Sequence, residues 1–152
     1  MRFKEFTNGP ISINVAEEGD GPVILCVHGW PELWYSWRHQ LTKFSEIGFK
    51  VCAMDVRGYG GSSKPLDVAS YSLKNLASDV AAVAAKLSDE PVVLFGHDWG
   101  APIVWQTALL HPDRVKAVAG LSVPYMPGTE TSFLDLAEQI YQGRFFYQKY
   151  FQ

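Results

Sequence analysis

The sequence has few of the features that identify a disulfide-rich, metal-binding or membrane protein. Its 152 residues include only two cysteines, Cys26 and Cys52, and these form no C-x-x-C motif, so neither a disulfide scaffold nor a cysteine metal site is favoured. No segment reaches the roughly 18 apolar residues of a membrane span, and the first residues contain no apolar run of signal-peptide length. We therefore expect a cytoplasmic protein with no membrane partner and no metal.

A strong charge of either sign is also lacking. The net charge is −3, with 19% charged and 47% hydrophobic residues, so the composition gives no reason to expect nucleic acid as a partner. It is the composition of one globular domain that is large enough to bury a core. Nine Phe, seven Tyr and five Trp are consistent with an apolar pocket, although a plain core explains most of them.

Strand and helix patterns alternate along the chain. Apolar runs of strand length predict buried strands at 23–27, 50–54, 92–95 and 115–121. Apolar residues at helical spacing predict helices over 37–44, 72–87 and 102–110. This alternation predicts an α/β fold with a mostly parallel sheet and helices on both faces. Two segments around an early turn, 2–6 and 11–15, predict an antiparallel edge, and the second should have one solvated face.

The segment from Gly96 to Gly100 is the most informative part of the sequence. It reads Gly-His-Asp-Trp-Gly between a predicted strand and a predicted helix, where a serine at the centre would indicate a nucleophile on a tight turn. The centre here is Asp98, and an aspartate is normally ionised at neutral pH, so it needs no base to attack. Attack on a saturated carbon gives an ester that a second step must hydrolyse. The pattern favours an epoxide or carbon–halogen substrate, with an ordinary polar loop as the alternative.

A second segment, His28-Gly29-Trp30-Pro31, directly follows the predicted strand at 23–27. A loop in this position can direct backbone N–H groups at the elbow, and together with the N–H of Trp99 these groups would form an oxyanion hole for ester hydrolysis. A simple turn after a strand is the alternative. For His28 itself, a structural hydrogen-bonding role is favoured over proton transfer.

The glycine-rich segment 55–63 has some features of a phosphate-binding loop. It lacks the G-x-x-x-x-G-K-[ST] order, however, and the next helix starts only near Ser72. Structural packing, with Asp55 and Arg57 hydrogen-bonded beside the elbow, is therefore favoured. We expect no cofactor.

These three segments, in this order, resemble the α/β-hydrolase fold family and in detail its epoxide hydrolases. Residues 28–38 are similar to that family's H-G-x-P segment, 57–63 to its R-G-Y-G-x-S loop, and 96–100 to its G-H-D-W-G elbow. The tail at 145–152 looks like the first tyrosine-bearing segment of the family's cap domain. The resemblance covers essentially the whole chain.

The resemblance implies roles for individual residues. Asp98 would open the epoxide, and the backbone amides of Trp30 and Trp99 would form the oxyanion hole. The Trp30–Pro31 peptide bond would be cis, which costs little before proline. The substrate pocket would include His28, Pro31 and Phe145.

Tyr147 would be a lid tyrosine that hydrogen-bonds the epoxide oxygen and protonates the alkoxide, because a phenol can donate there while staying neutral at pH 7. An aromatic run that only packs is one alternative, and Tyr150 in this role is another. By the same resemblance, residues 1–124 would be the amino-terminal part of an α/β-hydrolase core, truncated before its last strands. Residues 125–152 would begin a helical cap.

The family's second lid tyrosine, its acid and its base histidine all follow the cap. None of the four histidines here matches that base. We therefore expect a missing carboxy-terminal half, or a second chain, to complete the catalytic machinery. The chain alone should form the Asp98 ester and hydrolyse it only weakly.

Two other functions remain alternatives to an epoxide hydrolase acting on a small-molecule epoxide. A haloalkane dehalogenase would also use an aspartate, but that family usually has a polar residue at the position of Trp30 and uses no lid tyrosine like Tyr147. The similar fluoroacetate dehalogenases typically have Arg in place of Trp99. A non-catalytic α/β-hydrolase-like binding domain is the second alternative.

Overall fold

The computed structural model describes residues 1–127 and 133–142 of the chain. The predictions for Phe145 and Tyr147 lie outside these residues. Within the segment 125–152, which we expect to begin a cap, the structure describes one helix, α4 (Phe133–Tyr141). The boundary at residue 124 remains a prediction.

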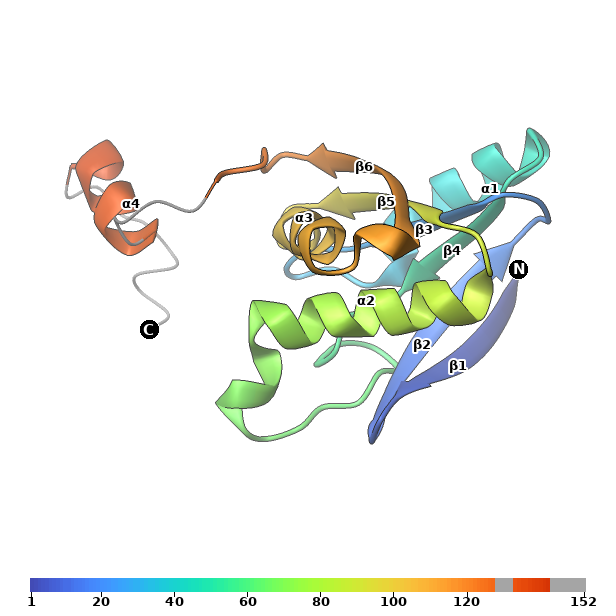
Figure 1. Ribbon diagram of the computed structural model, residues 1–152, viewed down its shortest axis with the longest axis horizontal. Helices are drawn as coiled ribbons and strands as arrows, with labels where there is room; N and C mark the ends of the chain where they lie inside the picture. Colours follow the sequence, from blue (N-terminus) through green and yellow to red (C-terminus); the bar gives the residue numbers. More distant parts are fainter. Residues whose placement is uncertain (128–132, 143–152) are drawn as a thin grey trace.

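A six-stranded sheet forms the centre of the described part of the chain (Figure 1). Its strands lie across the sheet in the order β1-β2-β4-β3-β5-β6. They are β1 (Arg2–Asn8), β2 (Ile11–Glu18), β3 (Val23–Val27), β4 (Lys50–Met54), β5 (Val92–His97) and β6 (Val115–Leu121). β2 pairs antiparallel with β1 and β4, and the other pairs are parallel. The prediction of a mostly parallel sheet with an antiparallel edge is confirmed.

Helices cover both faces of this sheet, as the alternation of elements predicts. They are α1 (Arg38–Glu46), α2 (Leu73–Leu87) and α3 (Gly100–Leu110). Neighbouring residues of β4 define the two layers. Val51 packs in a core cluster with Leu41 of α1, whereas Cys52 packs in another with Val80 of α2 and Val104 of α3. Burial on both faces explains the continuous apolar runs of β3 and β4.

Two helices begin at residues other than those predicted. A short 3-10 turn, Trp34–Trp37, precedes α1, so the α-helix starts one residue later than its apolar stripe indicates. α3 starts at Gly100, two residues early, and this leaves Pro102 in the first turn, where a backbone N–H has no helical partner. Ser72 caps α2 as predicted, since its side chain accepts from the Asn75 N–H.

One face of β2 is less solvated than the alternation of its residues predicts. Ser12 and Asn14, which should face water, are half-buried by the loop that follows β4. Asn14 Nδ2 donates to Asp55 Oδ2 at 2.8 Å, and the Ser12 N–H donates to Ser63 Oγ at 2.9 Å. The prediction of a wet face is wrong because a loop distant in the sequence lies on it.

β6 lies at the end of the sheet, and no described segment pairs with its outer side. The strand is partly exposed, including Leu121 at 44% of its surface. An apolar strand with an unpaired edge can pair with another chain. Among the described residues, the outer edge of β6 is therefore available for pairing with a further strand.

Candidate active site

Asp98 occupies the sharp turn between β5 and α3. β5 ends at His97 and α3 begins at Gly100. The backbone of Asp98 has a φ of 52°, in the left-handed region that costs a residue with a side chain about 1–2 kcal/mol. Its N–H donates to the Leu121 carbonyl oxygen at 3.2 Å, and its carbonyl oxygen accepts from the Ala101 N–H at 3.0 Å. The turn is thus held from both sides, at the carboxyl end of the parallel strands where α/β sheets bind ligands.

The two glycines of the elbow are required by close packing. A Cβ on Gly96 would lie 2.6 Å from Val104 Cγ2, and its other near neighbour is the backbone of Gly100. A Cβ on Gly100 would lie 2.7 Å from the Val27 carbonyl carbon and 2.8 Å from the His28 carbonyl oxygen. Side chains at either position would separate β5, α3 and the loop after β3. The G-x-D-x-G spacing therefore follows from the packing of these three elements.

The carboxylate of Asp98 rests against the loop after β3. Its Oδ1 accepts a hydrogen bond from the Trp30 N–H at 2.9 Å. A Cβ on Gly29 would lie 2.8 Å from Asp98 Cγ, so only glycine allows this approach. Among the described residues, nothing donates to Asp98 Oδ2, and the Trp99 N–H donates to no protein atom. One carboxylate oxygen is held and the other is available to react.

The Trp30–Pro31 peptide bond is cis, as predicted. Glu32, one residue further, ties this loop to the elbow. Its Oε2 accepts from the Gly29 N–H at 3.1 Å, and its Oε1 lies 3.1 Å from His97 Nδ1. Because side chains alternate along a strand, His97 points toward Glu32 and away from the side chain of its neighbour. Sequence reasoning did not identify Glu32 as a link between the two loops.

His28 is a buried structural residue, as expected. The Val56 N–H donates to Nε2 at 3.0 Å, so Nε2 carries no proton, and Nδ1–H donates to the Gly29 carbonyl oxygen at 2.7 Å. Burial lowers the pKa of His28, opposed by the hydrogen bond to Gly29 and the charge of Asp55. A neutral His28 with a fixed tautomer therefore joins the loops after β3 and β4.

We expect His28 to make the protein less stable in mild acid. Its pKa is about 6.5 in the unfolded chain and lower in the folded one, so the unfolded state binds the proton first. The stability that His28 contributes is fully present above pH about 6.5. It falls by up to about 1.4 kcal/mol per pH unit as the pH drops toward the folded pKa. Urea unfolding on either side of this window measures the loss.

Two variants test this assignment. His28→Gln removes the titrating group and should flatten the profile between pH about 6.5 and the folded pKa. His39→Gln, at an exposed position, should keep the wild-type profile. A loss of stability that persists unchanged in His28→Gln would assign it to other groups.

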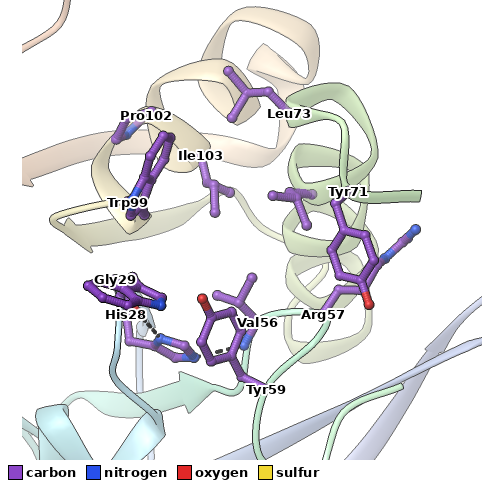
Figure 2. Close-up of a pocket in the computed structure, with 12 residues that line it drawn as sticks. His28, Gly29, Val56, Arg57, Tyr59, Tyr71, Leu73, Trp99, Pro102 and Ile103 are labelled. Carbon is purple, nitrogen blue, oxygen red and sulfur yellow. Dashed lines mark hydrogen bonds between the residues drawn. The ribbon is translucent and has the colours of Figure 1, made fainter. Parts of the chain in front are cut away.

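A cavity of about 320 Å³ opens beside the elbow (Figure 2). The loops after β3 and β4 form one side of it, and residues at the start of α2 and α3 form the other. The lining residues are His28, Gly29, Trp30, Val56, Arg57, Tyr59, Tyr71, Leu73, Leu76, Trp99, Pro102 and Ile103. This mostly apolar lining with a few polar groups is typical of a small-molecule site.

Of the predicted site residues that the structure describes, His28, Trp30 and Trp99 line this cavity, whereas Asp98 and Pro31 do not. Asp98 is not itself in the lining, but its carboxylate lies against Gly29 and Trp30, which are, and it directly precedes Trp99. His28 lines the cavity as predicted. Pro31 is exposed and does not line the cavity.

Sequence reasoning missed the wall opposite the elbow. Leu73 and Leu76 belong to the apolar stripe that predicts α2, and this stripe by itself does not indicate a cavity. They lie in the first turn of α2, ahead of the fully buried Ala77 and Val80. The first residues of the stripe therefore line the cavity, and the later ones pack in the core. The sequence signal was therefore present, but it does not distinguish a cavity wall from a core.

The glycine-rich loop is used for packing, as predicted. Asp55 Oδ1 accepts from the Trp34 N–H, and Asp55 Oδ2 from the Gly61 N–H, each at 2.9 Å. Arg57 pairs through Nε and Nη2 with the carboxylate of Asp79, both at 2.8 Å. Arg57 is therefore bonded to α2. Asp55, through its bond to Trp34, holds the segment that follows the Trp30 loop.

The part of the chain that the structure describes lacks two other kinds of feature. No helix there is long and apolar enough to cross a membrane. No group of three or more His, Cys, Asp or Glu side chains in these residues is arranged to hold a metal ion. Cys26 and Cys52 are buried and unpaired, and burial raises the pKa of both thiols, so they are packing residues.

Comparison with known proteins agrees with this geometry. A sequence family described as the alpha/beta hydrolase fold matches residues 22–152. Epoxide hydrolase A of Mycobacterium tuberculosis is 43% identical over 148 residues, which cover 96% of this chain and 46% of that protein. Epoxide hydrolase 3 of Siraitia grosvenorii is 47% identical over 121 residues, which cover 80% of this chain and 38% of that protein.

Solved structures give the same result. The crystal structure of Epoxide Hydrolase A from Mycobacterium thermoresistibile has a TM-score of 0.92 and 40% identity, covering 99% of this chain and 48% of that one. An epoxide hydrolase from Vigna radiata has a TM-score of 0.87 and 40% identity, covering 92% and 44%. The chain spans less than half the length of these relatives. With its elbow, its Trp30 loop and its sheet order, the chain belongs to the alpha/beta hydrolase fold family.

Proposed function

We propose that this protein acts in epoxide hydrolysis, with Asp98 as the nucleophile. One observation carries the proposal: the Trp30 N–H holds Asp98 Oδ1, while Oδ2 has no donor among the described residues. This orients the carboxylate with one oxygen free, beside a cavity of about 320 Å³. Relatives named epoxide hydrolase at 40–47% identity support the same reading.

In the first step Asp98 Oδ2 attacks a ring carbon, and the ring C–O bond breaks. The oxygen leaves as an alkoxide, which takes up a proton and becomes the hydroxyl of a β-hydroxy ester. Tyr147, predicted as the proton donor, lies outside the described residues. We retain it as a proposal, together with a cap that starts near residue 125.

In the second step water adds to the ester carbonyl carbon, and the diol leaves. Negative charge develops on Oδ1 while the water adds, where the Trp30 N–H already lies at 2.9 Å, and it is lost again when the diol leaves with a proton. The Trp99 N–H, which has no protein acceptor in the described part of the chain, would be the second donor. One such donor typically contributes on the order of 3 kcal/mol to a transition state of this kind.

The water needs a base, and the described histidines near the elbow do not supply one. His28 uses both ring nitrogens in hydrogen bonds, and the side chain of His97 is directed toward Glu32 and away from that of Asp98. We propose that the base comes from a segment outside the described residues or from a second chain. A cytoplasmic location, expected from the sequence, remains part of the proposal.

Covalent capture tests the function. The protein is incubated with styrene oxide and, separately, with a primary haloalkane, and its intact mass is followed over time. We expect a mass increase equal to one epoxide, located at Asp98 by peptide mapping. Halide release without an epoxide adduct would assign the site to a haloalkane dehalogenase instead. No adduct from either reagent would favour a binding domain.

A further inference from the structure

The cavity beside Asp98 contains few polar side chains, and most of them are already occupied. Apart from two half-exposed indoles, its lining includes a hydroxyl, imidazole or guanidinium at four positions. His28 uses both ring nitrogens, and Tyr71 donates its hydroxyl to the Pro65 carbonyl oxygen at 2.7 Å. Arg57 uses Nε, Nη1 and Nη2 in bonds of 2.8 Å to Asp79 and to a backbone carbonyl. Only Tyr59 remains.

Tyr59 has an available donor in a defined position. Its ring packs edge-on against the His28 ring, with centroids 5.1 Å apart and an interplanar angle of 78°. Figure 2 shows its hydroxyl directed into the cavity, in the space between the Gly29 loop and α3. Among the described residues, this hydroxyl forms no hydrogen bond. His28, against which this ring packs, is itself held at both nitrogens.

The hydroxyl also stays protonated. Burial raises the pKa of Tyr59, and the negative charge of Asp98 raises it further. The phenol is therefore a hydrogen-bond donor at neutral pH, close enough to the nucleophile to sense its charge.

We propose that Tyr59 Oη binds an acceptor oxygen on the substituent of the epoxide, such as an ether or hydroxyl oxygen next to the ring. This rests on the proposed function and names its substrate class: oxygenated epoxides are preferred over hydrocarbon epoxides of the same shape. A donor without a partner in an apolar cavity selects for an acceptor, because a hydrocarbon leaves the buried phenol unpaired.

The epoxide oxygen itself is a poorer partner for Tyr59. A displacement at carbon proceeds in line, so the ring oxygen leaves on the side opposite the attacking Asp98. Tyr59 lies on the side of the cavity that the loops after β3 and β4 form, and the Asp98 carboxylate rests against Gly29 on that side. A substituent on the attacked ring would instead extend into the lined space, which Val56 borders on the side of Tyr59 and Leu76 and Ile103 border on the other.

The test compares two probes in two variants. The probes are phenyl glycidyl ether and its carbon analogue, in which a methylene group replaces the ether oxygen. The rate constant for adduct formation at Asp98 is measured by intact mass for each probe. Tyr59→Phe keeps the ring on His28 and removes only the hydroxyl. For each protein, the rate constant of the ether probe is divided by that of the carbon analogue. The readout is this ratio in the wild type divided by the same ratio in the variant. The intrinsic reactivities of the two probes cancel in this quotient.

We expect this quotient to be about 3 to 10 for Tyr59→Phe. Tyr71→Phe is the matched control: it removes a hydroxyl from the same cavity that is already bonded to Pro65, so its quotient should be near one. A quotient near one for Tyr59→Phe would overturn the proposal, because a purely structural role slows both probes alike.

A second measurement keeps the inference separate from the proposed function. In Asp98→Asn, where no ester can form, the glycols of the two probes are titrated against the tryptophan fluorescence of the cavity. The ether glycol should bind about 3 to 10 times more tightly, and Tyr59→Phe should remove the difference. If no probe alkylates Asp98 but this difference is present, the catalytic proposal fails and the Tyr59 assignment stands. Equal binding of both glycols overturns the assignment.

Discussion

Asp98→Asn is expected to abolish covalent capture of an epoxide and to leave the fold intact. The amide oxygen of Asn is uncharged and a far weaker nucleophile, so adduct formation should fall by at least about 10³-fold. Asn can still accept the Trp30 N–H bond that Asp98 Oδ1 accepts at 2.9 Å. It also tolerates the left-handed backbone at φ 52° as well as Asp does. Thermal unfolding should therefore stay close to that of the wild type.

The measurement is the rate of the epoxide mass increase, with the mass of the variant checked so that deamidation back to Asp is detected. Asp113→Asn is the control, because its carboxylate is exposed on the surface turn before β6. It should alkylate at the wild-type rate. An adduct that forms as fast in Asp98→Asn as in the wild type would place the nucleophile elsewhere. Retained ligand binding without an adduct is the result expected for an intact site without its nucleophile.

Local patterns in the sequence predicted the parts of this fold that depend on neighbouring residues. The buried strands appear as apolar runs because helices cover both faces of the sheet. The elbow could be found from Gly96 and Gly100, because both glycines are required by contacts within the strand–turn–helix unit and with β3. The cis bond before Pro31 came only from the family resemblance.

Contacts between distant segments could not be predicted in the same way. The polar residues of β2 indicated a solvated face, but Asn14 instead bonds to Asp55 in a loop whose path the local pattern does not determine. The cavity could not be predicted for the same reason. Tyr59 and Leu73 are ordinary loop and helix residues until folding places them on opposite sides of one space. Nothing in the sequence indicates that Glu32 links two loops, except its position directly after Pro31.

The pairing of Arg57 with Asp79 is such a long-range contact, and its loss should have the largest effect on stability. Asp79 accepts two bonds from Arg57 and one from Asn8 Nδ2, all at 2.8 Å. The side chains of the ion pair are only 7% and 1% exposed. Asp79→Ala leaves the guanidinium buried without its carboxylate, which typically costs about 3–5 kcal/mol. Natural domains have only about 5–15 kcal/mol of stability in total.

Urea unfolding measures this effect, and two comparisons separate the lost charge partner from a general defect. Arg57→Met combined with Asp79→Leu removes both charges and should be more stable than Asp79→Ala alone, because an apolar pair replaces an unpaired charge. Glu46→Ala, which breaks the exposed pair with Lys43, should cost less than about 1 kcal/mol. If Asp79→Ala were no more costly than Glu46→Ala, the pair would not hold the loop of Tyr59 against α2.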